Sequence, residues 1–226
     1  ESIQSKLLSM QDTPYRDFNA KLIPTVDPKR MIGIRTPLLR KFAKDLFKME
    51  PKQAAAFMQS LPHRYFEENN LHAFLIENIK DFTTVMAETE RFLPFIDNWA
   101  TCDTFAPPLF KKYPDEVYQK ILIWIRSPRT YTVRYAINLL LSNYLDDRFK
   151  PEMLELVSTV KSEEYYINMM IAWYFSFALI KQYDAALPYI KKQTLVPFTH
   201  NKTIQKAVES SRIPAEIKDY LRTLKV

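Results

Sequence analysis

The chain contains a single glycine, Gly33, but 15 prolines. Hairpin turns between β-strands usually need glycine, because its backbone reaches positive φ angles without strain. A β-rich fold is therefore disfavoured. Many of the prolines stand where they would open a helix, a position at which the missing N–H would have no partner anyway. These prolines are Pro37, Pro51, Pro114, Pro128, Pro151 and Pro214. The scarcity of glycine and the positions of the prolines predict an all-α protein.

Apolar residues recur at helical spacing through almost the whole chain. After two short N-terminal helices, the segment 23–34 holds two prolines and is expected to be an ordered connector. Thr36 is expected to cap the next helix. The predicted helices are 2–10, 15–22, 36–49, 51–61, 64–80, 83–93, 95–106, 108–112, 115–126, 128–145, 151–161, 163–182, 184–192, 201–211 and 214–225.

A weak internal repeat relates the later helices to one another. The segment Tyr131–Ile137 aligns with Tyr166–Ala172 at an offset of 35 residues, close to the length of a HEAT-like helical pair. Such pairs stack antiparallel into a curved α-solenoid, whose second helices line a concave face. We therefore expect one HEAT-like solenoid domain over residues 1–226, with an irregular helical bundle as the alternative.

Composition narrows the class of partner. The chain has 32 Lys and Arg against 26 Asp and Glu, a net charge of +6 and a pI near 9.2. A surplus of positive charge fits nucleic acid or an anionic surface. Cys102 is the only cysteine, which excludes an internal disulfide and favours a reducing, cytoplasmic setting. The most apolar run, Met169–Ile180, is interrupted by Ser176 and is too short to span a membrane.

The few histidines and the single glycine disfavour metal sites and nucleotide-binding loops. The three histidines, His63, His72 and His200, are not at metal-ligand spacing and are expected on the surface or in packing contacts. One glycine cannot build a glycine-rich phosphate loop. We therefore predict no metal, no nucleotide cofactor and no other cofactor.

The stretch Asp97–Asp103 carries a tryptophan, Trp99, four residues before the carboxylate of Asp103. On a helix this spacing puts the two side chains on one face, one turn apart. An electron-rich ring beside a negative charge suits a cationic target. A core Trp99 with a solvated or capping Asp103 is the plainer alternative.

Four segments together resemble the AlkD-type DNA alkylation repair family. They are Ile32–Lys44, the Trp99/Asp103 pair, Arg134 within Val133–Ile137, and Trp173 within Met170–Trp173. Asp103 and Arg134 are 31 residues apart, and Arg134 and Trp173 are 39 apart. The resemblance spans most of the chain.

The resemblance implies a solenoid that holds alkylated double-stranded DNA in a basic concave cleft and acts as a DNA glycosylase on cationic N3- or N7-alkylated purines. It implies that the lesion is not flipped into a pocket. Asp103, Trp99 and Trp173 would form the active site, and Arg134 would hold a phosphate. Further DNA contacts are expected from Lys111, Lys112, Arg129, Arg35, Thr36, Arg40 and Lys202. The protein would act as a monomer, on the nucleoid while bound to DNA.

The chemistry fits these residue types. Alkylation gives the purine a positive charge and makes it a good leaving group, so no strong general acid is needed. Positive charge then develops on the sugar as the glycosidic bond lengthens. A fixed carboxylate near C1′ stabilises that charge by about 3 kcal/mol. Asp103 is predicted in this role and in positioning water.

Other residues are expected to have structural roles. Trp124 is predicted in the core, and Tyr165, Tyr166, Tyr174 and Phe175 between repeats; Glu67 and Glu68 are predicted to be solvated or capping. The segments 15–24 and 200–210 differ from the family's usual pattern. Two alternatives therefore remain: a duplex-DNA-binding protein without glycosylase activity, and a protein-interaction scaffold.

Overall fold

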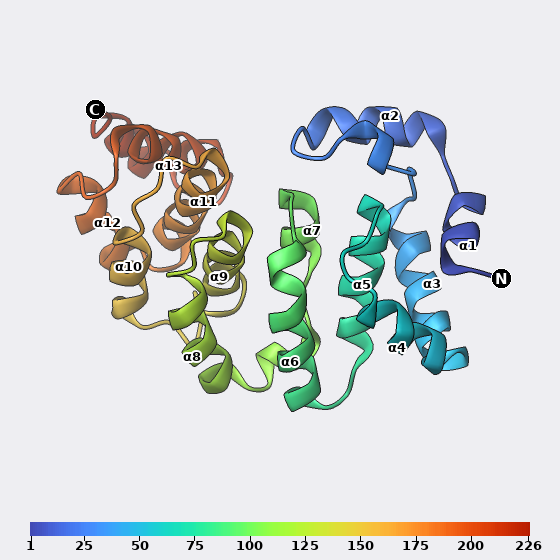
Figure 1. The fold of residues 1–226 in the computed structure, drawn as a ribbon. Coiled ribbons are helices and arrows are strands. Elements are labelled where there is room, and N and C mark those ends of the chain that lie inside the picture. The colour runs from blue at the N-terminus through green and yellow to red at the C-terminus, as the bar shows by residue number, and fades with distance from the viewer. The chain divides into compact units, whose positions relative to one another are not determined.

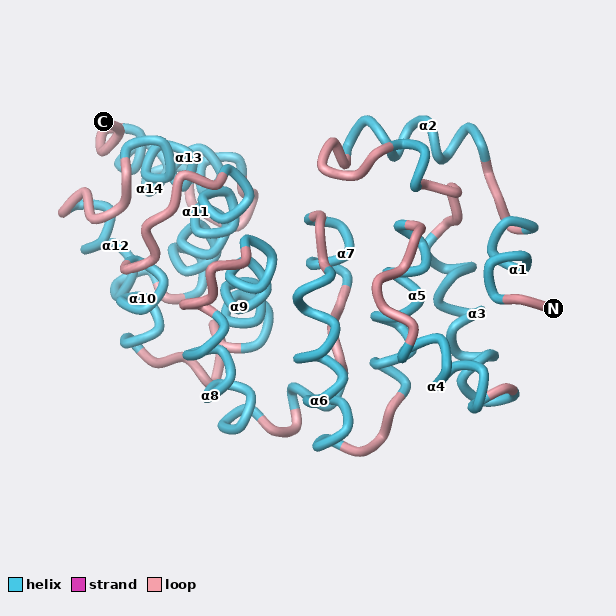
Figure 2. Tube along the Cα trace, in the orientation of Figure 1, coloured by secondary structure: helices cyan, strands magenta, loops and turns pink.

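The computed structural model describes all residues from 1 to 226 and contains only helices, connecting loops and turns (Figures 1 and 2). The all-α prediction is confirmed. No helix has both the length and the apolar content needed to cross a membrane. The chain divides into two compact units, Glu1–Tyr113 and Pro114–Val226, which we describe separately.

In the first unit, α3, α5 and α7 pack side by side, and α4 and α6 cover α5 from a second layer. The helices are α1 (Ile3–Ser9), α2 (Thr13–Leu22), η1 (Pro28–Arg30), α3 (Thr36–Met49), α4 (Pro51–Gln59), α5 (Phe66–Asn78), α6 (Phe82–Phe92), η2 (Leu93–Phe95), α7 (Trp99–Thr104) and η3 (Pro108–Lys111), where η marks a 3-10 helix. The central α5 is buried on most sides, which explains why apolar residues are spread around its circumference.

The second unit has the same two-layer construction. Helix α11 packs against α9 on one side and α13 on the other, and α8, α10 and α12 contribute the second layer. The helices are α8 (Pro114–Trp124), α9 (Thr130–Asn143), α10 (Pro151–Ser158), α11 (Tyr165–Lys181), α12 (Tyr183–Lys191), α13 (Pro197–Glu209) and α14 (Ala215–Arg222). Because α11 lies between two neighbours, it is apolar all round.

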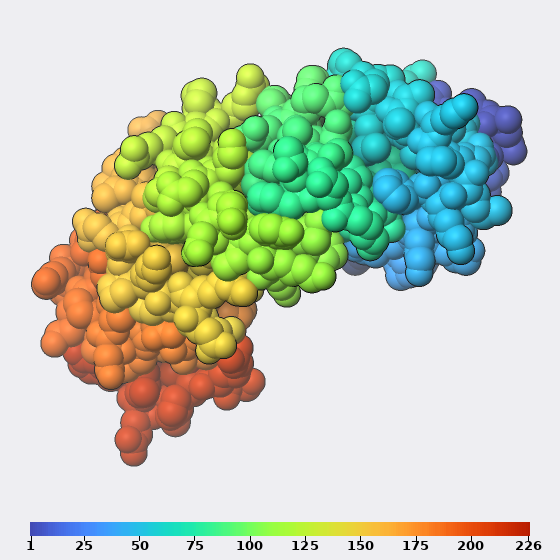
Figure 3. All heavy atoms as spheres, turned by 90° about the horizontal axis from the view of Figure 1, so that it is seen from below, coloured from blue at the N-terminus to red at the C-terminus, as the bar shows by residue number.

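Within each unit the helices follow one another across the surface in chain order, as the colour sequence in Figure 3 shows. Stacking in chain order is typical of repeated helical pairs. The solenoid and the single domain over residues 1–226 stay predictions.

Proline positions explain most helix starts. As predicted, α4, α8 and α10 begin at Pro51, Pro114 and Pro151. The prediction for Pro128 is wrong, because α9 begins at Thr130. The start of α13 was also misplaced, since Pro197 opens it four residues before the predicted 201.

Two other local predictions are wrong. Thr36 does not cap α3: it is the first helical residue, and Arg35 occupies the cap position without a side-chain hydrogen bond. The predicted helix 95–106 is interrupted, because Asn98 takes an extended conformation and starts α7 anew.

The core contains most of the predicted packing residues. Trp124, Tyr174 and Phe175 are buried, as predicted. Tyr165 lies at the first turn of α11 and is 54% exposed, but its ring centre lies 6.2 Å from that of Phe198 on α13, so it packs between neighbouring helices as predicted. All three histidines are buried, which confirms packing roles.

Candidate functional site

Helix α7 carries Trp99 and Asp103 and is held in place at its first turn. The buried side chain of Asn98 accepts a hydrogen bond from the Thr101 N–H at 2.8 Å, and its amide donates to the Thr101 hydroxyl at 3.0 Å. That hydroxyl donates in turn to Asn70 Oδ1 on α5, at 2.7 Å. A short helix gains little stability by itself. These contacts therefore determine where Trp99 and Asp103, both partly exposed, are presented.

Trp99 is anchored by both its polar and its apolar atoms. Its indole N–H donates to the Leu22 carbonyl at the end of α2, at 2.8 Å. Its ring packs against the buried cluster of Ile23, Val26, Met31 and Phe66. The side chain thus has a packing role as well as an exposed surface, and the core alternative for Trp99 is partly correct.

The loop Met31–Arg35, which we call the entrance loop, is organised by a buried carboxylate. Glu67 Oε1 accepts from the Ile32 N–H at 2.8 Å, and Oε2 accepts from the Gly33 N–H at 2.9 Å. Burial raises the pKa of Glu67, and these backbone N–H groups oppose the rise. The prediction that Glu67 is solvated or capping is wrong, whereas Glu68 does cap α5 by accepting from the Tyr65 N–H.

Gly33 brings the entrance loop against α2. Its φ of 89° lies in the left-handed region, and a Cβ there would lie 2.5 Å from both Arg16 Cβ and the Asp12 carbonyl oxygen. The Gly33 carbonyl accepts from the Asp12 N–H at 2.7 Å. Only glycine fits this close approach.

Three predicted DNA contacts lie on or beside the start of α3. Arg35 and Thr36 are exposed, and Arg35 pairs with Asp12 at 3.1 Å. Together with the Tyr15 N–H, this guanidinium lowers the pKa of Asp12. Arg40 pairs with Glu77 at 3.1 Å and lies over the Phe74 ring.

Arg40 also approaches the catalytic candidates. Its guanidinium donates to the Thr104 carbonyl at 3.4 Å, one residue after Asp103. Burial raises the pKa of Glu77, and Arg40 opposes the rise. Arg40 therefore has a structural ion pair in addition to its predicted contact with DNA.

The remaining basic candidates are spread over both units. Lys111 and Lys112 are exposed at the end of η3 in the first unit. In the second unit, Arg129 is exposed at the cap position of α9. Lys202 lies 5.9 Å from the centre of the Phe198 ring on α13.

Arg134 and Trp173 meet on neighbouring helices of the second unit. The Arg134 guanidinium carbon lies 5.5 Å from the centre of the Trp173 ring, and Nη1 donates to the Tyr166 carbonyl at 2.7 Å. Arg134 is 2% exposed. Lys206 on α13 approaches the same ring, with Nζ 4.5 Å from its centre. Two cationic side chains therefore flank the Trp173 ring.

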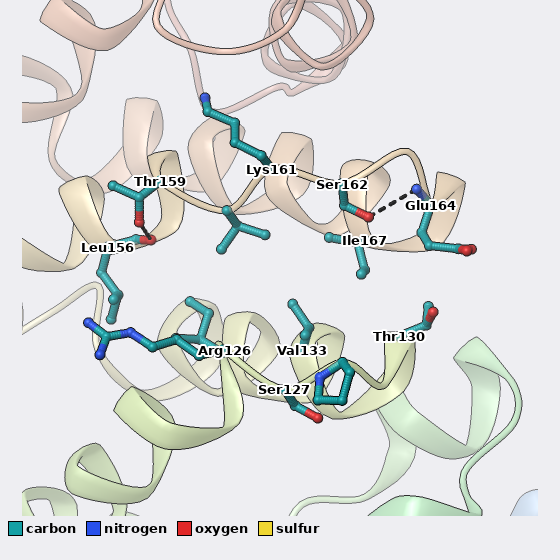
Figure 4. Close-up of a pocket in the computed structure, with 13 residues that line it drawn as sticks. Arg126, Ser127, Thr130, Val133, Leu156, Thr159, Lys161, Ser162, Glu164 and Ile167 are labelled. Carbon is teal, nitrogen blue, oxygen red and sulfur yellow. Dashed lines mark hydrogen bonds between the residues drawn. The ribbon is translucent and has the colours of Figure 1, made fainter.

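A separate cavity of about 500 Å³ opens between the α8–α9 and α10–α11 connections of the second unit (Figure 4). Val133 and Ile167 line its centre, and Arg126, Lys161 and Glu164 stand around its rim. None of the predicted site residues lines it. No group of three or more His, Cys, Asp and Glu residues lies close enough to hold a metal ion.

A family model described as DNA alkylation repair enzyme matches residues 3–209. The chain belongs to this family. The match includes every predicted site residue, and the resemblance carried by Ile32–Lys44 and the two tryptophans is confirmed at family level. No curated protein matches the chain.

In this DNA alkylation repair family member, four of the predicted site residues lie in two pairs. Trp99 and Asp103 share α7 in the first unit, and Arg134 and Trp173 meet in the second. Convergence of the two pairs on one groove stays a prediction. Sequence reasoning missed Lys206 and the Glu67 hydrogen bonds. Lys206 could have been found from its position four residues after Lys202 on one helix, whereas nothing local indicates the partners of Glu67.

Proposed function

We propose that the protein is a DNA glycosylase that releases cationic N3- or N7-alkylated purines from duplex DNA. Membership of a DNA alkylation repair enzyme family supports a role on alkylated DNA. The single observation that carries the assignment is the anchoring of α7. Its cap, its link to α5 and the Trp99–Leu22 hydrogen bond present an indole and a carboxylate one turn apart, both partly exposed.

Catalysis in this proposal is electrostatic. The alkylated base leaves as a neutral purine, and the sugar becomes cationic as its bond to the base lengthens. The Asp103 carboxylate stabilises that cation and orients the water that attacks C1′. Because the anchored helix holds the carboxylate in advance, little reorganisation is needed, and the effect is expected to reach about 3 kcal/mol.

The two tryptophans have different environments, which supports different roles. Trp99 would offer its exposed surface to the cationic base or sugar, an attraction of about 0.5–2 kcal/mol. Trp173, flanked by Arg134 and Lys206, would contact the sugar–phosphate backbone. Further phosphates of the DNA backbone would be contacted by the exposed cations Lys111, Lys112, Arg129 and Arg35.

The test is base release from duplexes that carry N7-methylguanine or N3-methyladenine. We expect Asp103→Asn to slow release on the order of a hundredfold while binding of the duplex is retained, because the isosteric amide lacks the negative charge. Asp184→Asn, an exposed carboxylate in the first turn of α12, is the matched control. Unchanged release by the Asp103 variant would exclude the proposed role.

Salt-sensitive binding of duplex DNA without base release from either lesion would favour the non-catalytic DNA-binding alternative. One observation favours this alternative: Trp99 packs on the Ile23 cluster, so its presence can be explained by folding alone, without a catalytic role.

A further inference from the structure

Three adjacent helices of the second unit each contribute one side chain to a continuous row. Arg134 comes from α9, Trp173 from the neighbouring α11, and Lys206 from α13 on the other side of α11. Both cations contact the same indole, with Nζ of Lys206 at 4.5 Å and the guanidinium carbon of Arg134 at 5.5 Å from the ring centre. We call this set the Arg–Trp–Lys row.

The two cations differ in how accessible they are. Arg134 is 2% exposed and is held by the Tyr166 carbonyl. Lys206 is partly exposed and extends over the ring from the last turn of α13. A ligand that approaches Trp173 from solvent therefore meets the ammonium group before the guanidinium.

Lys206 is the accessible ammonium group beside the Trp173 ring. Burial lowers the pKa of Lys206, the Glu209 carboxylate opposes that decrease, and the positive charges of Lys202 and Arg134 add smaller decreases. Cations held close together repel one another, and a bound anion relieves that repulsion. A DNA phosphate can also accept a charge-assisted hydrogen bond from the ammonium group.

We propose that Lys206 is a phosphate-binding residue for the DNA backbone, and that Arg134 acts with it by fixing Trp173 beneath the bound sugar–phosphate. The inference rests on the proposed function for its ligand, because membership of the repair family makes DNA the anion to consider. It adds a DNA-contacting residue on α13, where only Lys202 was predicted to bind.

A purely structural role for Lys206 makes a different prediction. A lysine in the last turn of a helix stabilises the negative end of the helix dipole, and its stem can cover an aromatic ring. In that case substitution would lower thermal stability and leave the number of phosphate contacts unchanged.

The experiment measures the affinity of the full chain for an undamaged duplex over a range of salt concentrations. Each phosphate contact contributes about 0.9 to the slope of log affinity against log salt. We expect Lys206→Gln to reduce that slope by roughly 0.9 and to weaken binding about tenfold near 0.1 M salt. Lys206→Arg should restore both values, and Lys206→Met, which keeps the stem, should behave like the glutamine variant.

Lys191→Gln is the matched control, since Lys191 is an exposed lysine in the last turn of α12 and its loss changes the net charge equally. Thermal unfolding of each variant shows whether a change in DNA affinity is caused by a loss of stability. An unchanged slope for Lys206→Gln, or an equal loss in the Lys191 variant, would overturn the inference.

The test is independent of glycosylase activity, because it uses undamaged DNA. If the wild-type protein releases no alkylated base but Lys206→Gln lowers the salt slope of duplex binding, the proposed function is refuted and this inference stands. A duplex that does not bind at low salt would refute both.

Discussion

Glu67 shows how one buried carboxylate can organise a loop from a distance in sequence. It lies on α5, 35 residues from Ile32 and 34 from Gly33, and accepts hydrogen bonds from both backbone N–H groups. Buried N–H groups without partners are unfavourable, so the carboxylate determines the conformation of the entrance loop. The loop ends at Arg35 and leads into Thr36, two of the predicted DNA contacts.

Replacing Glu67 with Gln should destabilise the protein by about 2–4 kcal/mol, because an amide N–H₂ group then faces a backbone N–H and one hydrogen bond is lost. Urea unfolding measures the change. Glu50→Gln is the control: Glu50 forms a solvent-exposed pair with Lys6, and its loss should change stability by about 1 kcal/mol or less. Equal effects in the two variants would contradict the proposed role of burial.

Gly33→Ala should be destabilising by at least about 1–3 kcal/mol, because the left-handed backbone is strained for alanine. The added Cβ would also meet the Asp12 carbonyl at 2.5 Å and push α2 away from the entrance loop. Chemical unfolding and duplex affinity should both respond. Thr25→Ala, at an exposed position of the connector, should leave stability and duplex affinity near their wild-type values. If Gly33→Ala also kept wild-type stability and affinity, the close approach of Gly33 to α2 would be contradicted.

At the level of elements, a column of four aromatic rings ties α4, α5 and α6 together. Phe57 stacks on His63 at 4.2 Å between ring centres, and His72 stacks on Phe92 at 4.5 Å. The two imidazoles share a hydrogen bond of 2.8 Å. Burial lowers the pKa of His63 to about 4 and that of His72 to about 3, with His63 and Arg91 adding to the shift of His72.

This column should make the protein less stable in acid. The folded pKa values of His63 and His72 lie below the ordinary value of 6.5, so between pH 6.5 and about 4 the unfolded chain binds more protons than the folded one. The contribution to stability is therefore complete above pH 6.5 and is lost as the pH falls toward 4. Glu67 and Glu77 act in the opposite sense, because burial raises their pKa values.

A comparison of variants separates the contribution of the histidines to the pH dependence of stability from that of the carboxylates. In the double variant His63→Phe/His72→Phe the ring stacking is kept and the titrating nitrogens are removed. We expect its free energy of unfolding to fall less than that of wild type between pH 6.5 and 4, as measured by urea unfolding at a series of pH values. The same pH dependence in both proteins would show that the histidines are not responsible.

At the scale of the whole molecule, a net charge of +6 and exposed cations in both units predict electrostatic binding to duplex DNA. With roughly three to five phosphate contacts, affinity should fall on the order of a hundredfold between 50 and 200 mM salt. Fluorescence anisotropy with a labelled undamaged duplex measures this. Negligible affinity at 50 mM salt would instead favour the protein-interaction scaffold.

The sequence by itself determined the helical class, most helix positions and the family. One glycine, many prolines and apolar periodicity act locally, so they can be interpreted without knowledge of distant contacts. The same holds for Trp99 and Asp103, because a spacing of four residues places two side chains on one face of any helix.

Only the tertiary structure decided which partners these residues have. It showed that Asn98 restarts a helix, that Trp99 hydrogen-bonds the end of α2, that Glu67 holds the entrance loop, and that Lys206 joins Arg134 beside Trp173. The physical reason is that burial and charge pairing depend on segments 30 or more residues apart, which periodicity along one helix does not encode.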